Sequence, residues 1–359
     1  MNCFMVSGNI PRVKPVWVPS ACPRPFGRSG RKGQRVECGV ATRWREALLT
    51  KRGKAHDAAV TAAVVLSDEP GVQEFVTSSL DTTVVYWRVE QLPDLGKSKV
   101  QSTRIALRRG PAFALSMDEE RCRHGAPSVL CGTSRQGVVS WEPSSDKLVQ
   151  KMTLPGHAGW VRSLVGNGRW LLSCDCNNLK LWDPSWSVPR QVDNAKLFTG
   201  DILRIALGDK SAYACTTDGS IHTWDIERKG KLAPAASLRN AHEGRISSVI
   251  LHKNHLYSVG FDGHLKMWNA ATLECEAEIS EAHTGKIHCA TLGADGLLHT
   301  GGDDGLIKRW APKDLSQVGY ALVCHQHPIR VLEAGKNRTL LSGDSSGLIS
   351  VWDLRQDLG

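Results

Sequence analysis

The chain has 359 residues, of which 41% are hydrophobic and 23% charged, a balance typical of a globular protein that can bury a large core. Its net charge is +9, but residues 1–45 contain nine Lys or Arg and one acid, so residues 46–359 carry only +1, which argues against a folded body built mainly to bind nucleic acid. The longest apolar stretches are shorter than the ~18 residues of a membrane span, and no secretory segment is evident.

Residues 1–45 are predicted to be a disordered leader. They are rich in proline and contain the basic run Gly27–Gly33, with no acid before Glu37, so they cannot bury enough apolar surface to fold alone. This composition resembles an organelle transit peptide, and Val36–Gly39 is similar to a plastid processing site. We expect a plastid (chloroplast) location, less often a mitochondrial one. The alternative is a basic tail in the cytoplasm or nucleus, with residues 28–35 as a nuclear signal or nucleic-acid contact.

The rest of the chain is a repeat. Seven short runs of strand-type residues each end in a tryptophan, at successive intervals of 54, 41, 42, 44, 42 and 42 residues. Turn signals such as Asp262-Gly263 precede most of these runs, because glycine accepts the positive φ of a tight hairpin. One sheet per repeat cannot bury its own faces, whereas seven sheets stacked in a ring can. The seven residues are Trp87, Trp141, Trp182, Trp224, Trp268, Trp310 and Trp352.

These marks resemble the WD40 repeat family. Trp-Asp occurs at Trp182-Asp183, Trp224-Asp225 and Trp352-Asp353, and Gly-His occurs at Gly156-His157. The resemblance implies an all-β fold, a seven-bladed β-propeller spanning residues 46–359. It also implies that a strand before the first blade, at residues 46–50, pairs with the last blade and closes the ring.

In that family a His, a strand Ser or Thr, the turn Asp and the Trp form a hydrogen-bonded set inside each blade. The resemblance implies that His56, Ser79, Asp81 and Trp87 form this set in blade 1. Equivalent structural roles are implied for His157, Trp182, Asp218, Trp224, His242, Asp262, Trp268, His283, Asp304, Trp310 and Trp352. At the Asp position, blades 2, 3 and 7 are expected to have Arg135, Cys176 and Ser346 instead.

No catalytic, metal or cofactor site is predicted. Cys324, His325 and His327 form a single group, and zinc usually takes two separated pairs of ligands; either histidine could be the structural His of blade 7. Cys174 and Cys176 also lack a second pair, and the eleven cysteines are expected to be free thiols. The sequence has no nucleophile elbow, phosphate loop or dinucleotide fingerprint.

Partner-binding residues are predicted in the long connections of blades 1 and 2. The segments 67–74, 91–102 and 118–126 are expected to be turns on one face, because loops on a rigid scaffold often carry specificity. Functionally neutral, solvated loops are the alternative. Trp160 is a candidate anchor on the opposite face. The acidic candidates in the long connections are Asp68, Glu69, Asp118, Glu119 and Glu120.

The predicted function is that of a non-catalytic protein–protein interaction scaffold. We expect a monomeric propeller that holds other proteins in a multiprotein complex inside an organelle. The first alternative is a substrate receptor of a cullin-based ubiquitin ligase, because Trp352–Arg355 matches the WDxR pattern of such receptors. The second is an RNA-associated propeller, although nucleic-acid binding is not favoured.

Overall fold

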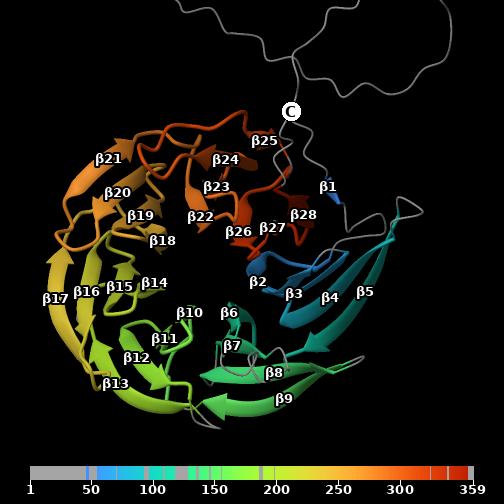
Figure 1. The fold of residues 1–359 in the computed structure, drawn as a ribbon, viewed down its shortest axis with the longest axis horizontal. Coiled ribbons are helices and arrows are strands. Elements are labelled where there is room, and N and C mark those ends of the chain that lie inside the picture. Colours follow the sequence, from blue (N-terminus) through green and yellow to red (C-terminus); the bar gives the residue numbers. More distant parts are fainter. Residues whose placement is uncertain are drawn as a thin grey trace, which may run out of the picture. The chain divides into compact units, whose positions relative to one another are not determined.

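The computed structural model consists of seven four-stranded antiparallel sheets arranged as the blades of a ring (Figure 1). All described residues belong to the compact unit Thr42–Gly359. The structure describes residues 46–47, 55–69, 71–92, 97–107, 110–117, 128–134, 137–144, 147–154, 156–185, 189–197, 199–323, 325–337 and 339–354. The predicted leader, residues 1–45, lies outside them, and so do Asp118, Glu119, Glu120, Arg135 and Arg355.

The strands of each blade are given from the centre of the ring outward, which is chain order in every blade except the last. Blades 1 to 3 comprise β2 (Val60–Glu69), β3 (Val72–Ser79), β4 (Thr83–Leu92) and β5 (Lys97–Ala106); β6 (Ala112–Met117), β7 (Val129–Thr133), β8 (Val138–Ser144) and β9 (Lys147–Leu154); β10 (Ser163–Gly166), β11 (Leu171–Cys174), β12 (Asn178–Asp183) and β13 (Arg190–Lys196). Blades 4 and 5 comprise β14 (Ile202–Leu207), β15 (Ser211–Thr216), β16 (Ile221–Ile226) and β17 (Leu232–Leu238); β18 (Ile246–His252), β19 (His255–Gly260), β20 (Leu265–Asn269) and β21 (Cys275–Ile279). Blades 6 and 7 comprise β22 (Ile287–Leu292), β23 (Leu298–Gly302), β24 (Leu306–Trp310) and β25 (Leu322–Val323); β26 (Ile329–Ala334), β27 (Thr339–Asp344), β28 (Ile349–Asp353) and β1 (Glu46–Ala47).

The core lies between the blades. Side chains of a strand alternate between its two faces, and here both faces are covered by neighbouring sheets. Leu171 packs into the cluster shared with blade 2, and the adjacent Leu172 into the cluster shared with blade 4. This explains why second strands such as β7 and β11 are buried at every position. Apolar burial of this kind is the main stabilising contribution to the ring.

The ring is closed by the predicted strand. β1 pairs antiparallel with β28, with Glu46 opposite Trp352 and Ala47 opposite Val351. The last blade therefore takes its outer strand from the start of the domain, and the prediction of closure is confirmed. The described part of the chain contains no helix with the length and apolar character needed to span a membrane.

The extra length of blade 1 extends its strands and does not make long turns. Residues 67–69 belong to β2, where Asp68 pairs with Gln73 of β3. Residues 91–92 and 97–102 likewise belong to β4 and β5, which pair as far as Leu92 and Lys97. The prediction of long turns at 67–74 and 91–102 was therefore wrong, because alternating residues there continue the ladder of hydrogen bonds.

Candidate functional site

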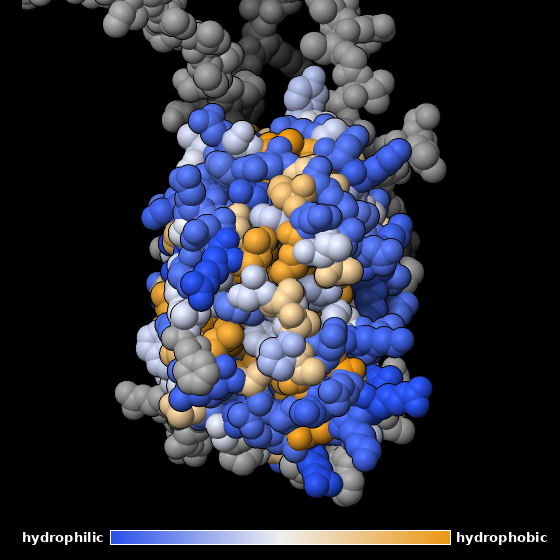
Figure 2. Space-filling model, turned by 90° about the vertical axis from the view of Figure 1, so that its left-hand side faces the viewer, coloured by the Kyte–Doolittle hydropathy of each residue, from blue (hydrophilic) through white to orange (hydrophobic). Residues whose placement is uncertain are grey.

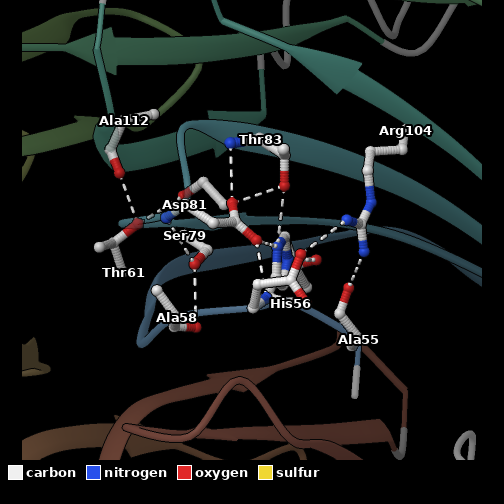
Figure 3. A network of polar contacts seen from close by, with 12 residues as sticks. Ala55, His56, Ala58, Thr61, Ser79, Asp81, Thr83, Arg104 and Ala112 are labelled. Atoms are coloured by element: carbon white, nitrogen blue, oxygen red, sulfur yellow. Dashed lines mark hydrogen bonds and ion pairs between the residues drawn. The ribbon is translucent and has the colours of Figure 1, made fainter. Parts of the chain in front are cut away.

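The hydrogen-bonded set of blade 1 is built around His56 (Figure 3). Its Nδ1 lies 3.1 Å from the Asp81 carboxylate, and its Nε2 lies 2.9 Å from Thr77 Oγ1. The Trp87 indole N–H donates to the same hydroxyl at 2.9 Å. Since a carboxylate only accepts, Nδ1 carries the proton, and the Thr77 hydroxyl accepts from Trp87 and donates to His56. Burial lowers the pKa of His56 despite the nearby Asp81, which favours this neutral imidazole.

The hydroxyl of this set belongs to Thr77 and not to Ser79. Trp87 pairs with Phe75 across the sheet, so the indole reaches the residue two positions further along β3. Ser79 lies another two positions away, roughly 7 Å along the strand. It donates to the Ala58 carbonyl at 2.9 Å and accepts from the Asp81 amide at 3.1 Å. Its role is to cap the turn.

Blades 5 and 6 contain the complete set at the predicted positions. His242 contacts Asp262 at 2.9 Å and Ser258 at 2.7 Å, and Trp268 donates to Ser258 at 2.8 Å. In blade 6 the same contacts join His283, Asp304, Thr300 and Trp310 at 2.7–2.9 Å. Two residues after the hydroxyl stands glycine in both blades, Gly260 or Gly302. A side chain there would collide with the histidine, so glycine leaves the space for the His–Asp contact.

Blades 3 and 7 also contain the set, but their carboxylate comes from two residues after the hydroxyl. In blade 3, His157 Nδ1 lies 3.1 Å from the Asp175 carboxylate but outside hydrogen-bond geometry, whereas its Nε2 lies 2.6 Å from Ser173 Oγ and Trp182 donates to Ser173 at 2.8 Å. In blade 7, His325 contacts Asp344 at 2.9 Å and Ser342 at 2.8 Å, and Trp352 donates to Ser342 at 2.9 Å. The expectation that Cys176 and Ser346 replace the Asp was therefore wrong. The carboxylate occupies the place where blades 5 and 6 have glycine.

Blades 2 and 4 have other residues at the hydroxyl position. Trp141 pairs across the sheet with Val129, and Trp224 with Ala212. The residues two positions further along, where the other blades have the hydroxyl, are Cys131 and Ala214. Asp218, at the predicted turn of blade 4, accepts hydrogen bonds from Thr216 and from the Ser220 amide. Cys131 is fully buried and burial raises its pKa to about 12, so it acts as a small packing residue. These two blades rely on apolar packing.

Asp68 is not part of a free acidic surface. Its side chain is 7% exposed, and its carboxylate accepts from the amides of Thr339 at 3.0 Å and Asn337 at 3.2 Å. It therefore fastens blade 1 to blade 7, and the expectation that it lies in an exposed acidic turn was wrong. Glu69 is exposed at the end of β2. The other acidic candidates and Arg355 lie outside the described residues.

Trp160 is exposed at the face of the ring on which the innermost strands begin, which we call the mouth face. The side chain is 49% exposed and stacks on Phe113, with ring centroids 5.1 Å apart and an interplanar angle of 8°. The Arg162 guanidinium lies 5.7 Å from the centroid of the Trp160 ring. These contacts hold an exposed aromatic ring in one orientation.

Beside this aromatic pair, a pocket of about 370 Å³ opens at the centre of the mouth face. The innermost strands of the blades lie around the centre of the ring (Figure 1). In most blades the first strand has a bulge one residue after its start, for example between Ile287 and Cys289 in β22, and a bulge re-aims a side chain. The residues at this position in six blades, together with Arg162 just before β10 in blade 3, all line the pocket: Thr61, Phe113, Arg162, Leu203, Ser247, His288 and Arg330.

The pocket is lined by four arginines, Arg162, Arg204, Arg245 and Arg330. Its other walls include Leu80 and Phe261. These arginines were not among the residues predicted from the sequence. The sequence contained a partial indication, because Arg or His recurs at residues 162, 204, 245, 288 and 330, at intervals of 42, 41, 43 and 42, although Arg204 and Arg245 lie one and two residues away from the bulge position of their blades.

Other surfaces have fewer features of a binding site than the mouth face. Figure 2 looks onto the outer wall around blades 4 and 5, where apolar side chains lie among hydrophilic ones. A groove of about 910 Å³ between these blades is lined mainly by small and polar residues such as Ser211, Thr223 and Asn269. Within the part of the chain that the structure describes, no group of three or more His, Cys, Asp or Glu could hold a metal ion.

The ring and the repeated His–hydroxyl–Trp sets define a seven-bladed β-propeller. Residues 148–183 and 234–269 match the family model described as "WD domain, G-beta repeat", so the chain carries WD40 repeats. Propellers of this kind are typical protein-interaction scaffolds and are generally non-catalytic.

Solved structures support the same fold. The chain superposes on the WD40 β-propeller domain of Doa1 with a TM-score of 0.70 and 18% identity, covering 88% of this chain and 98% of that one. A computationally designed protein, Ika8, gives a TM-score of 0.60 at 18% identity, covering 83% and 97%. These likenesses establish the architecture.

Among curated proteins, the chain is similar to plant proteins named for a zinc finger. It is 26% identical over 164 residues to zinc finger CCCH domain-containing protein 17 of Oryza sativa subsp. japonica, and 27% identical over 137 residues to zinc finger CCCH domain-containing protein 62 of Arabidopsis thaliana. The matches cover 45% and 38% of this chain, and 36% and 32% of those proteins. The aligned part thus spans about a third of each relative.

Proposed function

We propose that this chain is a non-catalytic scaffold that holds partner proteins against the mouth face of its propeller, within a multiprotein complex in a plastid. The observation that carries the docking face is Trp160, a half-exposed indole stacked on Phe113. Large aromatic residues at fixed positions are the side chains that most often dominate the binding energy of protein interfaces. Since the ring is closed and Trp160 is stacked on Phe113, a partner would meet this surface already formed.

The docking face is tested by comparing two exposed aromatic residues. Trp160→Ala removes the anchor, and Tyr320→Ala removes a side chain that is 93% exposed in blade 6. The full chain and both variants would be purified from the source organism with a C-terminal tag, after cross-linking. We expect Trp160→Ala to lose associated proteins that Tyr320→Ala retains. If both variants retain the same set, the mouth face is not the docking face.

The plastid location is supported by the leader, in which basic residues and prolines occur with no acid before Glu37. A C-terminal fluorescent fusion of the full chain is expected in plastids, and deletion of residues 1–45 is expected to abolish import. N-terminal sequencing should find a mature chain starting near Gly39. A cytoplasmic or nuclear signal with Met1 retained would overturn this location. Purified cullin adaptor binding that depends on Arg355 would then favour the ligase alternative.

A further inference from the structure

We infer that the pocket at the mouth face binds an acidic peptide segment of a partner protein, with carboxylates held by Arg162, Arg245 and Arg330. This inference rests on the proposed scaffold function and specifies the chemistry of the partner. The pocket has about 370 Å³, within the range of sites that take small groups and side chains. Four arginines and His288 line it, and its lining contains no carboxylate among the described residues.

The positive charges of this pocket are mostly not neutralised by the protein itself. Arg204 donates to the carbonyls of Arg162 at 3.1 Å and Leu203 at 3.0 Å. The Arg245 guanidinium lies 5.0 Å from the centroid of the Phe261 ring. Of the four, Arg162 is the one with a carboxylate contact in the described part of the chain, at 3.5 Å from the half-exposed Asp201. The pocket thus keeps several guanidinium groups available.

The arginine side chains of the pocket repel one another. Burial lowers the pKa of Arg245, and the charges of Arg162 and Arg330 lower it further. Burial also lowers the pKa of Arg204, where Arg245 and Arg162 add to the effect. A bound anion would relieve this repulsion and supply the partners that partly desolvated cations lack.

One arginine is held in place for an incoming anion. Arg330 Nη1 lies 3.1 Å from His288 Nδ1, and His288 Nε2 lies 2.6 Å from the Asp303 carboxylate. Because Asp303 can only accept, Nε2 carries the proton and Nδ1 accepts from Arg330. Burial lowers the pKa of His288 although Asp303 acts to raise it, and the charges of Arg330 and Lys286 add to the lowering. The neutral imidazole therefore orients the Arg330 guanidinium, whose other N–H groups suit a bidentate carboxylate.

The surroundings favour a peptide over a nucleic acid. Residues 46–359 carry a net charge of only +1, whereas a nucleic-acid backbone is followed by an extended basic surface. Asp201 and Asp303 lie beside the pocket with side chains 47% and 36% exposed, so the basic surface is confined to the pocket and does not extend as a nucleic-acid backbone requires. Exposed Leu80 and the stacked Phe113 and Trp160 offer apolar contacts for neighbouring peptide side chains.

The test is a fluorescence anisotropy titration of the full chain with the fluorescein-labelled peptide Gly-Glu-Glu-Leu-Glu-Glu-Gly. The double variant Arg245→Gln/Arg330→Gln is expected to bind at least about tenfold more weakly, because two charge-assisted contacts are lost. The matched control Arg228→Gln/Arg239→Gln removes the same charge from exposed positions in blade 4 and should bind like the native chain. Circular dichroism would establish that both variants are folded. The affinity of Arg245→Lys/Arg330→Lys for the peptide is expected to lie between the affinities of the Gln double variant and the native chain, since lysine keeps the charge without the bidentate geometry.

Three results would overturn the inference. The first is peptide binding by the native chain that both double variants weaken equally, which would indicate net charge alone. The second is no peptide binding by the native chain. The third is binding of a single-stranded RNA 12-mer, but not the peptide, that is lost in Arg245→Gln/Arg330→Gln. If Trp160→Ala loses its partners while the native chain fails to bind the peptide, the pocket inference falls and the scaffold function stands. If Trp160→Ala loses nothing, the scaffold's docking face falls instead.

Discussion

The backbone N–H of His56 donates to the carbonyl of Gly347 at 3.1 Å, and this contact joins the first blade to the last. The same joint recurs between consecutive blades, where His242 donates to Gly219 at 3.3 Å and His325 to Gly305 at 3.4 Å. In these three pairs of neighbouring blades, the turn glycine of one blade therefore contacts the histidine segment of the next. The first and last blades are therefore held together by the same backbone contact that joins other neighbouring blades, and also by the pairing of β1 with β28.

Gly347→Ala is expected to destabilise the protein by about 2–4 kcal/mol. Gly347 has φ +91°, and an added Cβ would collide with the backbone carbonyl of His56. The control is Gly244→Ala, because Gly244 has φ +94° with open space around it and should cost only about 1 kcal/mol. Urea denaturation of both variants measures the difference. Equal losses would mean that the joint with His56 contributes nothing beyond backbone strain.

Thr77→Val is expected to lower the free energy of unfolding by about 2–3 kcal/mol, because it leaves the buried Trp87 N–H and His56 Nε2 without their common partner. Ser79→Ala removes a turn-capping bond from an equally buried position and should cost about 1 kcal/mol. Denaturant titration would rank the two. A larger loss for Ser79→Ala would contradict the assignment of the hydroxyl to Thr77.

Glu333→Gln is expected to stabilise the protein at alkaline pH. Glu333 lines the channel below the mouth pocket, and burial raises its pKa from 4.5 to about 8. The unfolded chain ionises this carboxyl more readily, so its contribution is intact below pH 4.5 and is lost as pH rises toward 8. The variant should match the native chain near pH 5 and exceed it by up to about 3 kcal/mol at pH 8.5. A constant difference across this range would show that the carboxyl titrates normally.

Stability is expected to fall as pH drops below 6.5. Burial lowers the pKa values of His56, His222, His252 and His288. Since the unfolded chain takes up these protons first, the loss begins at the unfolded pKa of about 6.5 and continues through the lower folded values. Urea titrations from pH 7.5 to 5 should be made in Glu333→Gln, because Glu333 acts in the opposite direction. A profile that is flat or rises toward acid would contradict the shifts.

The architecture was predictable because it depends on periodic features. The tryptophan spacing set the number of blades, and the residues from 46 preceded the first blade with no other strand to pair with. Both follow from backbone pairing and burial, and the same sequence pattern for them recurs in each repeat. The structure confirms the seven blades and the strand that closes them.

The side-chain contacts were harder to predict from the sequence, because they depend on which residues face each other across the strands. Choosing Ser79 over Thr77 requires knowing that Phe75 faces Trp87. The carboxylates of Asp175 and Asp344 were missed because only one spacing before the tryptophan was considered. Asp68 looked like an exposed acid in a turn, whereas its partners Asn337 and Thr339 lie at the other end of the chain.

The mouth pocket could have been anticipated in part. Its basic residues recur at the period of the repeat, but the sequence does not state that a strand bulge turns His288 and Arg330 toward the centre. Long-range geometry of this kind is set by how the blades close into a ring.

The docking face is tested most directly by photo-cross-linking from a single position. A benzoylphenylalanine placed at Trp160 in the full chain, and in a second sample at Tyr320, would be irradiated in the source organism and the linked proteins identified by mass spectrometry. We predict that position 160 captures a discrete partner, and that the captured peptide maps to an acidic segment. Position 320, although 93% exposed, should not capture it. Capture of the same partner from position 320 and not from 160 would contradict docking at the mouth face.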